Sequence, residues 1–163
     1  MTKPTKIIVY FHGNAEDVGI SYELMVKMSV TYKCSVIAME YPGYGIYRTE
    51  QADADTLMTN AHILMQYLIH VQKYCEKDII LVGRSMGSGP ASALAVEYPS
   101  VSALILLSPY TSLKQAVKTL LGTLASLIVR ERFENLKLIQ KVRCPTLLIH
   151  GQKDEIIPES HAI

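Results

Sequence analysis

The sequence predicts an α/β fold, a doubly wound and mostly parallel sheet with helices on both faces. Two observations lead to this prediction. Short, continuous apolar runs alternate with longer segments of helical periodicity along the chain of 163 residues. Such runs are typical of strands buried on both faces, and strands that alternate with helices form a parallel sheet through right-handed crossovers. In addition, each run ends in a polar or glycine-rich loop, as expected where reactive groups gather at the carboxyl ends of parallel strands.

Five apolar runs supply the predicted strands, which are Ile7–Phe11, Ser35–Met39, Ile79–Val82, Ala103–Leu107 and Thr146–Ile149. The segments between them supply the predicted helices, which are Tyr22–Tyr32, Asp53–Lys73, Met86–Tyr98 and Leu113–Val129. In the second and fourth of these helices, apolar residues recur at helical spacing and fall on one face. Ser112 precedes the fourth helix and is its expected N-cap, because a serine oxygen accepts a hydrogen bond from the first helical N–H groups.

The length and the absence of an interdomain linker predict a single domain over residues 1–163. The formal net charge is +1 and 49% of the residues are apolar, a balance that argues against a disordered tail or a nucleic-acid-binding surface. Apolar runs are too short to span a membrane, and the start MTKPTK shows no N-terminal signal. We therefore expect no nucleic-acid partner and no transmembrane segment.

The three cysteines, Cys34, Cys75 and Cys144, are odd in number and far apart in the sequence. This usage predicts reduced thiols and a cytoplasmic protein. The cysteines and histidines show no metal-ligand spacing, and neither a P-loop nor a Gly-x-Gly-x-x-Gly follows the first strand. The sequence therefore predicts no metal and no cofactor.

Ser85 lies in a Gly-x-Ser-x-Gly motif, between the predicted strand Ile79–Val82 and the predicted helix Met86–Tyr98. A strand, a sharp turn and a helix form the setting of a nucleophile elbow, which strains the serine backbone and requires small residues beside it. The serine oxygen is then exposed at a helix N-terminus, where the helix dipole favours negative charge. The alternative is a structural turn that contains a serine. The context favours a catalytic nucleophile.

An acyl-transfer nucleophile needs two N–H donors directed at the developing oxyanion. The first expected donor is the backbone N–H of Met86, the residue after the nucleophile. The second is expected in the loop 12–15 (HGNA), which follows the first strand. Asn14 is preferred there, although the sequence does not separate it from Ala15. The alternative for this loop is a plain Gly-Asn turn that enters a helix.

Asp154 lies just past the fifth predicted strand, where the chain order Ser, acid, His places the acid of a triad. Its expected role is to orient and stabilise an imidazolium, and the alternative is an exposed turn aspartate. The only histidine after it is His161, in a helix opened by Pro158 that should lead away from the strand ends. His161 is therefore a poor candidate for the base, and we expect the catalytic histidine to lie beyond Ile163.

The other four histidines are weaker candidates still. His12 and His150 precede glycines at strand ends and have the pattern of loop-shaping residues. His62 and His70 lie in the long helix before Ser85 and are expected on or near the surface.

Six segments together resemble the α/β-hydrolase-domain serine hydrolases: FHGNAEDVG, EYPGYG, GRSMGSGPA, LLSPYTSLKQAVKTLLG, ERFENL and CPTLLIHGQKDEIIP. Among these hydrolases, the chain is most similar to the branch that includes acyl-protein thioesterases, the protein depalmitoylases. The resemblance covers essentially the whole chain and implies an α/β-hydrolase fold with strand order 4-3-5-6-7 in family numbering. It also implies Ser85 as nucleophile, Asp154 as acid, and Asn14 with Met86 as oxyanion donors.

The chain matches the family core without its first two strands, its last strand and histidine loop, or the cysteine-rich N-terminus of the mammalian depalmitoylases. The expected function is a serine hydrolase that cleaves esters or thioesters through a triad completed by a histidine outside this chain. The expected partner is a small acyl ester or thioester or an acylated protein, bound by a cytoplasmic monomer with peripheral membrane contact. The alternatives are a non-catalytic binding module and an aminopeptidase-type serine hydrolase.

Two features bear on the substrate. The apolar segment Leu113–Val129, within a possible cap at 112–132, either lines an acyl pocket or is an ordinary helix on the sheet, and the second interpretation is favoured. Tyr41, Tyr44 and Tyr110 follow strands and are expected to flank the pocket mouth.

Overall fold

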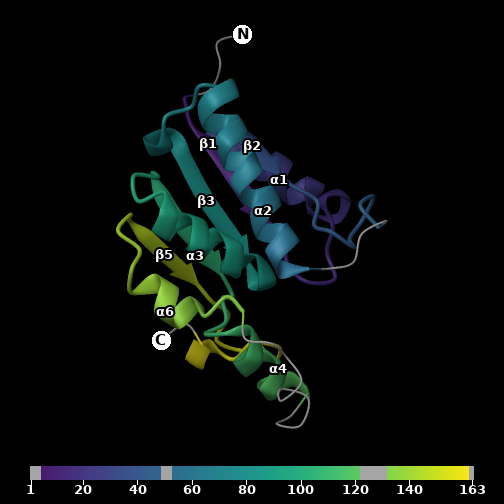
Figure 1. Ribbon diagram of the computed structural model, residues 1–163. Helices are drawn as coiled ribbons and strands as arrows, with labels where there is room; N and C mark the ends of the chain where they lie inside the picture. Colours follow the sequence, from purple (N-terminus) through teal and green to yellow (C-terminus); the bar gives the residue numbers. More distant parts are fainter. Residues whose placement is uncertain (1–4, 49–52, 122–131, 162–163) are drawn as a thin grey trace.

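The computed structural model describes residues 5–48, 53–121 and 132–161. Its centre is a five-stranded sheet in the order β2-β1-β3-β4-β5, and every pair of neighbouring strands is parallel (Figure 1). The strands are β1 (Ile7–Phe11), β2 (Ser35–Ala38), β3 (Ile79–Arg84), β4 (Ala103–Leu107) and β5 (Thr146–Ile149). The predicted fold class is confirmed, and so is the strand order that the resemblance implies.

The principal helices are α1 (Val18–Tyr32), α2 (Ala54–Gln66), α3 (Ser88–Glu97), α4 (Leu113–Leu121) and α6 (Asn135–Ile139). Short turns of other helix types occupy Tyr67–Val71, Glu76–Asp78, Ser85–Gly87 and Glu159–His161. In Figure 1, α2 and α3 lie in front of the sheet, whereas α1 lies behind it. The sheet is therefore covered from both sides, as a doubly wound fold requires.

Local capping explains where the helices begin. Helix α1 starts at Val18, earlier than predicted, because the carboxylate of Asp17 accepts a hydrogen bond from the N–H of Ile20 at 2.8 Å. The predicted helix Asp53–Lys73 is α2 followed by a π-helical turn. The predicted N-cap Ser112 is confirmed, since its hydroxyl oxygen accepts from the N–H of Gln115 at 3.2 Å.

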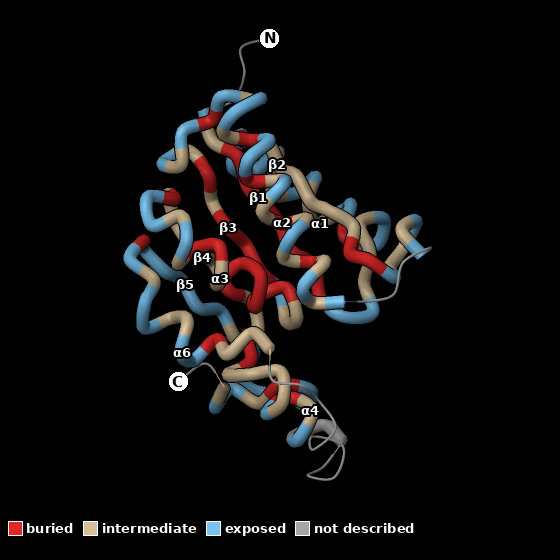
Figure 2. The backbone as a smooth tube through the Cα atoms, in the orientation of Figure 1, coloured by how far each residue is buried: buried red, intermediate tan, exposed pale blue. Residues whose placement is uncertain are grey.

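Alternate side chains of β1 enter two separate hydrophobic cores. Ile7, Val9 and Phe11 pack with residues of α2 and α3 in one cluster. Ile8 and Tyr10 pack in a second cluster, against α1. The buried segments run through β1, β3 and α3 in Figure 2. Because both faces of the central strands are buried, their loops are fixed in position at the carboxyl edge of the sheet.

The edges of the described structure are more exposed. All four residues of β5 are exposed, and Leu147 retains 51% of its accessible surface. The predicted helix Leu113–Val129 is observed as α4 as far as Leu121, and residues 122–131 lie outside the described part. Within the ranges that the structure describes, none of the helices has the length and apolar character needed to cross a membrane.

Candidate active site

Ser85 stands at the turn between β3 and α3. Its φ is +49°, in the left-handed region that costs a residue with a Cβ atom about 1–2 kcal/mol. Arg84 ends the strand in extended conformation, and a short 3₁₀ turn from Ser85 to Gly87 leads directly into the helix. Ser85 itself is half-exposed. The strained serine predicted from the motif is therefore present at the carboxyl edge of the sheet.

Both glycines of the motif are required by close backbone contacts. A Cβ atom at Gly83 would lie 2.5 Å from the carbonyl oxygen of Gly87. One at Gly87 would lie 2.1 Å from the carbonyl oxygen of Phe11, the last residue of β1. These distances are shorter than any non-bonded carbon–oxygen contact, so only glycine fits at either position. The tight turn brings the elbow against the end of the neighbouring strand.

A buried polar network supports the elbow from below. The hydroxyl of Ser88 donates to the carbonyl oxygen of Ser85 at 2.6 Å. The side-chain amide of Asn135 donates to Ser88 Oγ at 2.8 Å and to the carbonyl oxygen of Tyr110 at 3.0 Å. Ser88 and Asn135 are both buried. Asn135 is not evident from the sequence, because a single asparagine in a short helical segment gives no signal of a contact 47 residues away.

The loop after β1 lies beside the elbow. A Cβ atom at Gly13 would lie 3.6 Å from Cβ of Ser85, which is ordinary van der Waals contact. The next residue, Asn14, is exposed, and its Oδ1 accepts a hydrogen bond from the hydroxyl of Tyr44 at 2.6 Å. The structure therefore brings together three of the predicted site segments, which are the loop 12–15, Ser85 with Met86, and the loop after β2.

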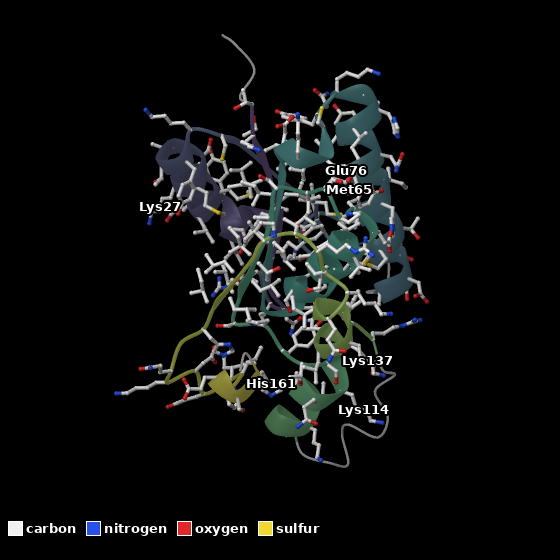
Figure 3. The ribbon with its side chains drawn as sticks, turned by 90° about the vertical axis from the view of Figure 1, so that its left-hand side faces the viewer. Lys27, Met65, Glu76, Lys114, Lys137 and His161 are labelled. Atoms are coloured by element: carbon white, nitrogen blue, oxygen red, sulfur yellow. The ribbon has the colours of Figure 1, made fainter. Side chains whose placement is uncertain are left out.

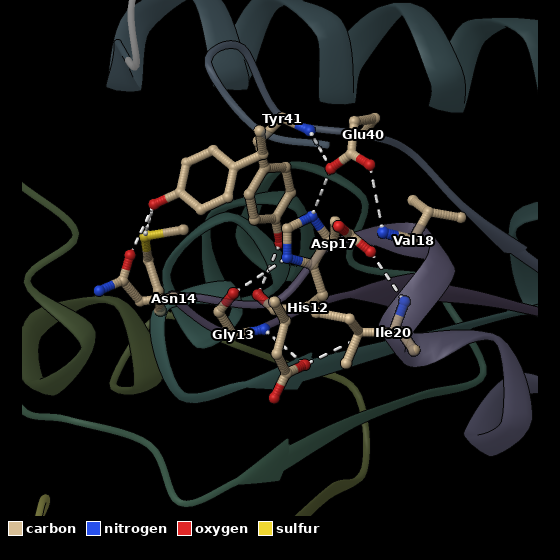
Figure 4. Close-up of polar contacts among 12 residues, drawn as sticks. His12, Gly13, Asn14, Asp17, Val18, Ile20, Glu40 and Tyr41 are labelled. Atoms are coloured by element: carbon tan, nitrogen blue, oxygen red, sulfur yellow. Dashed lines mark hydrogen bonds and ion pairs between the residues drawn. The ribbon is translucent and has the colours of Figure 1, made fainter. Parts of the chain in front are cut away.

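His12 anchors this loop from the inside (Figure 4). Its ring is fully buried and stacks on the ring of Tyr41, with centroids 3.8 Å apart. His12 Nε2 lies 3.1 Å from Oε1 of Glu40, and the hydroxyl of Tyr41 donates to the carbonyl oxygen of His12 at 2.9 Å. Oε2 of Glu40 in turn accepts from the N–H of Val18 at the start of α1. The sequence predicts the loop-shaping role of His12, but it gives no indication of Glu40.

Asp154 follows β5 and is held by backbone donors. Its Oδ1 accepts from the N–H groups of Ile156 and Ile157 at 3.0 and 2.9 Å. The hydrogen bond from Ile157 is the main cause that holds the pKa of Asp154 below its usual value. Smaller contributions come from the Ser108 side chain, the Ile156 N–H and the nearby His150 ring, whereas burial acts in the opposite direction. The carboxylate is therefore ionised at neutral pH.

His161 makes a hydrogen bond with the loop after β4 that does not suit a triad base. Its Nδ1 accepts a hydrogen bond from the N–H of Thr111 at 3.1 Å, so the proton of the neutral ring is on Nε2. A triad histidine instead donates from Nδ1 to the acid. Burial, together with the nearby His150 ring, lowers the pKa of His161. Figure 3 shows His161 on the last short turn, close to α4. The short turn Glu159–His161 therefore contacts the loop after β4, and the expectation that the segment after Pro158 leads away from the strand ends is wrong.

The remaining histidines have other partners. His62 hydrogen-bonds to the carbonyl oxygen of Met58 and pairs with Glu97, and His70 is exposed. His150 Nε2 donates to the carbonyl oxygen of Ile157 at 2.6 Å. Within residues 5–48, 53–121 and 132–161, no histidine hydrogen-bonds to Ser85. In the same residues, no group of three or more His, Cys, Asp or Glu side chains is gathered as a metal site.

The tyrosines expected at the pocket mouth divide into two kinds. Tyr41 and Tyr110 are only 1% and 2% exposed, so neither presents its ring to solvent, although Tyr110 lines a small hollow with Asn135 and His161. Both are core residues whose hydroxyls reach backbone carbonyl oxygens, of His12 and Met86 respectively. Tyr44 is half-exposed and contacts the site. Sequence position alone did not distinguish a loop residue that faces solvent from one that turns inward.

The hollow nearest α4 has a volume of about 430 Å³. It is lined mainly by polar and charged residues, namely Thr111, Ser112, Gln115, Glu134, Leu136, Lys137, Ser160 and His161. This lining gives no support to an acyl pocket in the described half of the segment Leu113–Val129. The other half, and with it residues 122–131 of the possible cap, lies outside the described residues.

Comparison with known proteins fits this geometry. The family described as "Serine aminopeptidase, S33" (Hydrolase_4) matches residues 2–140. The chain belongs to this family of α/β hydrolases. The human α/β hydrolase domain-containing protein 17B is 28% identical over 96% of this chain and 52% of its own length. The 163-residue chain spans about half the length of the curated relatives that it matches.

Solved structures show the same fold. An α/β hydrolase from Vibrio vulnificus superposes with a TM-score of 0.83 at 20% identity, over 98% of this hydrolase and 60% of that chain. Est1E from Butyrivibrio proteoclasticus, determined with bound ferulic acid, superposes with a TM-score of 0.74 at 20% identity, over 98% of this hydrolase and 74% of that chain. At this level of identity the likeness establishes the fold, and the chemistry has to be argued from the residues.

Proposed function

We propose that this chain carries the nucleophile, the acid and the oxyanion hole of a serine hydrolase that cleaves carboxylic esters or thioesters. Ser85 Oγ attacks the acyl carbon while a histidine takes its proton. The N–H groups of Asn14 and Met86 bind the oxyanion. The leaving alcohol or thiol receives the proton, and water then attacks the acyl-enzyme by the same route. Asp154 orients the histidine and stabilises its charged form.

The observation that carries this proposal is the backbone of Ser85. A left-handed serine between two glycines that admit no Cβ atom is costly, and such strain is concentrated at functional sites. A purely structural turn gains nothing from a serine there, since glycine adopts the same angles without strain. The position of Gly13 against Ser85 and the ionised state of Asp154 support the same chemistry.

The base in this proposal is a histidine outside residues 1–163. It is motivated by the surroundings of the five histidines, since His12, His62, His150 and His161 hydrogen-bond to other groups and His70 is exposed. The curated relatives are also longer than this chain. We therefore expect little or no turnover by residues 1–163 alone. Rapid hydrolysis of a p-nitrophenyl ester by these residues, abolished by Ser85→Ala, would overturn this expectation and make His161 the base.

We propose an acylated protein as the substrate, and therefore a depalmitoylase-like thioesterase. This proposal is supported by the resemblance of the segments HGNAEDVG and SPYTSLKQAV to the acyl-protein thioesterase branch. A cytoplasmic monomer with peripheral membrane contact belongs to the same proposal. The thiols agree with a reducing compartment, since Cys34, Cys75 and Cys144 are all free. The esterase neighbour and the aminopeptidase description of the family make simple esters and peptides the substrates to compare.

A non-catalytic binding module is the second candidate, favoured by the absence of a histidine contact to Ser85 among the described residues. Labelling with a fluorophosphonate probe separates the two. We expect the probe to label the full-length natural protein stoichiometrically at Ser85, and we expect Ser85→Ala to abolish this labelling. Ser102→Ala, at the opposite end of the sheet, is the matched control and should label like the wild type. A natural protein that does not label would favour the binding module.

A further inference from the structure

A carboxylate that the proposed mechanism does not use lies between the elbow and the neighbouring loop. Oε2 of Glu16 accepts hydrogen bonds from the N–H of Gly13 and from the hydroxyl of Ser21, each at 3.3 Å. Its other oxygen, Oε1, pairs with the guanidinium of Arg84. One side chain therefore contacts the loop after β1, the helix α1 and the end of β3.

The surroundings of this carboxylate are mostly protein. The side chain of Glu16 is only 15% exposed, whereas that of Arg84 is 50% exposed. The buried Tyr10 lies close enough to sense both charges. Burial raises the pKa of its phenol, the carboxylate of Glu16 raises it further, and Arg84 lowers it. The pair is thus embedded on its Glu16 side and open to water on its Arg84 side.

Two of the three contacts of Glu16 are one residue away from a group in the proposed mechanism. Gly13 precedes Asn14, whose N–H is a proposed oxyanion donor. Arg84 precedes Ser85, the proposed nucleophile. Gly13 belongs to the loop after β1 and Arg84 ends β3, so in the proposed mechanism the contacts of Glu16 bear on the spacing between that loop and the elbow. The N–H of Gly13 already donates to Glu16, so it is the following N–H groups that are left to face a substrate.

We propose that Glu16 is a positioning residue that holds the loop after β1 against the nucleophile elbow through Gly13 and Arg84. This role rests on the proposed function. It predicts a characteristic pattern, because an ion pair whose guanidinium is half-exposed to water contributes little to stability, whereas a small displacement of a catalytic group can cost a large factor in rate. Breaking the pair should therefore slow the reaction of Ser85 much more than it destabilises the fold.

Four variants of the natural protein test the role. Glu16→Gln keeps an oxygen that can accept from the N–H of Gly13 but removes the charge. Arg84→Met removes the guanidinium, Arg84→Lys keeps the positive charge, and Glu16→Gln with Arg84→Met closes a double-mutant cycle. The matched control is Lys6→Met, which breaks the ion pair between Lys6 and Asp78 at the amino ends of the same two strands.

The readout is the reaction of Ser85 with a fluorophosphonate, resolved into the maximal rate and the half-saturating probe concentration. We expect Glu16→Gln and Arg84→Met each to lower the maximal rate about tenfold, with half-saturation changed by less than about twofold. The double variant should be no slower than either single variant. Arg84→Lys should recover most of the rate, and the control should match the wild type. The melting temperatures should stay within about 3 °C of the wild type.

Two results would overturn the positioning role while leaving the proposed function intact. One is a wild-type rate in both single variants, and the other is a double variant whose loss is the product of the single losses. A wild-type protein that does not label at Ser85 would instead overturn the proposed function, and this role with it. The backbone amide NMR signals of Gly13 and Asn14 give a separate check. They should shift in Glu16→Gln and Arg84→Met, and remain in place in Lys6→Met.

Discussion

The hydroxyl of Tyr44 lies 2.6 Å from Oδ1 of Asn14 and 3.8 Å from Sδ of Met86. One side chain from the loop after β2 therefore touches both residues whose N–H groups are the proposed oxyanion donors. Glu16, in the same loop as Asn14, accepts from the N–H of Gly13, so Glu16 and Tyr44 together restrict the loop after β1. The proposed oxyanion hole is thus held by side chains from neighbouring loops as well as by its own backbone.

Replacing Tyr44 with phenylalanine should loosen this arrangement without unfolding the protein. The ring is retained and only the exposed hydrogen bond to Asn14 and the weak contact with the Met86 sulfur are lost, so the free energy of unfolding should fall by about 1 kcal/mol or less. The fluorophosphonate labelling rate of Ser85 should fall by about threefold to tenfold. Tyr32→Phe, on the exposed face of α1, is the control and should change neither quantity. Labelling of Tyr44→Phe at the wild-type rate would contradict the idea that the Tyr44 hydroxyl holds the loop with Asn14 in place.

The backbone strain at Ser85 predicts an order of stability among its variants. Ser85→Gly relieves the left-handed conformation at φ +49°, whereas Ser85→Ala retains it. We expect the glycine variant to be more stable than the alanine variant by about 1 kcal/mol, from urea unfolding curves. Neither variant should label with a fluorophosphonate. Equal stabilities would mean that the turn is not strained in solution.

The contact between Gly87 and Phe11 predicts a large cost for a single methyl group. Gly87→Ala would place a Cβ atom 2.1 Å from a backbone oxygen of β1, which forces the strand and the turn apart. We expect a loss of about 3 kcal/mol or more in the free energy of unfolding. The control is Gly151→Ala, whose Cβ atom would meet nothing closer than 3.9 Å and should cost less than about 1 kcal/mol.

The lowered pKa of Asp154 predicts a dependence of stability on acid. Because the native state holds this carboxylate ionised more readily than the unfolded state does, the native state binds fewer protons. Its contribution is therefore fully present above the usual carboxyl pKa, and it is lost as the pH falls through the lowered native value. We expect Asp154→Asn to be less stable than the wild type at pH 7, and the difference to be smaller at about pH 3, where the native carboxylate begins to take up a proton. A difference that is the same at both pH values would contradict this assignment.

Much of the fold followed from local pattern. The apolar runs located β1, β4 and β5 to the residue, since continuous apolar side chains are typical of the strands of a parallel sheet. The start of α1 was missed by four residues, because the cap at Asp17 lies in a polar loop that has no apolar periodicity. The buried positions of Tyr41 and Tyr110 were missed for a related reason. The position of a tyrosine just after a strand does not indicate whether its side chain faces solvent or the core.

The candidate site likewise has one part that the sequence predicts and another that depends on the tertiary structure. By itself, the sequence determined the types and the order of the candidate catalytic groups, because these follow from strand ends and turn chemistry. It places a serine elbow after the third strand, a Gly-Asn loop after the first and an aspartate after the fifth. Only the tertiary structure decided their distances and supports. The contacts of Glu16 with Arg84, Tyr44 with Asn14 and Asn135 with Ser88 join residues from separate elements. They form only after the strands are packed side by side, so no local pattern encodes them.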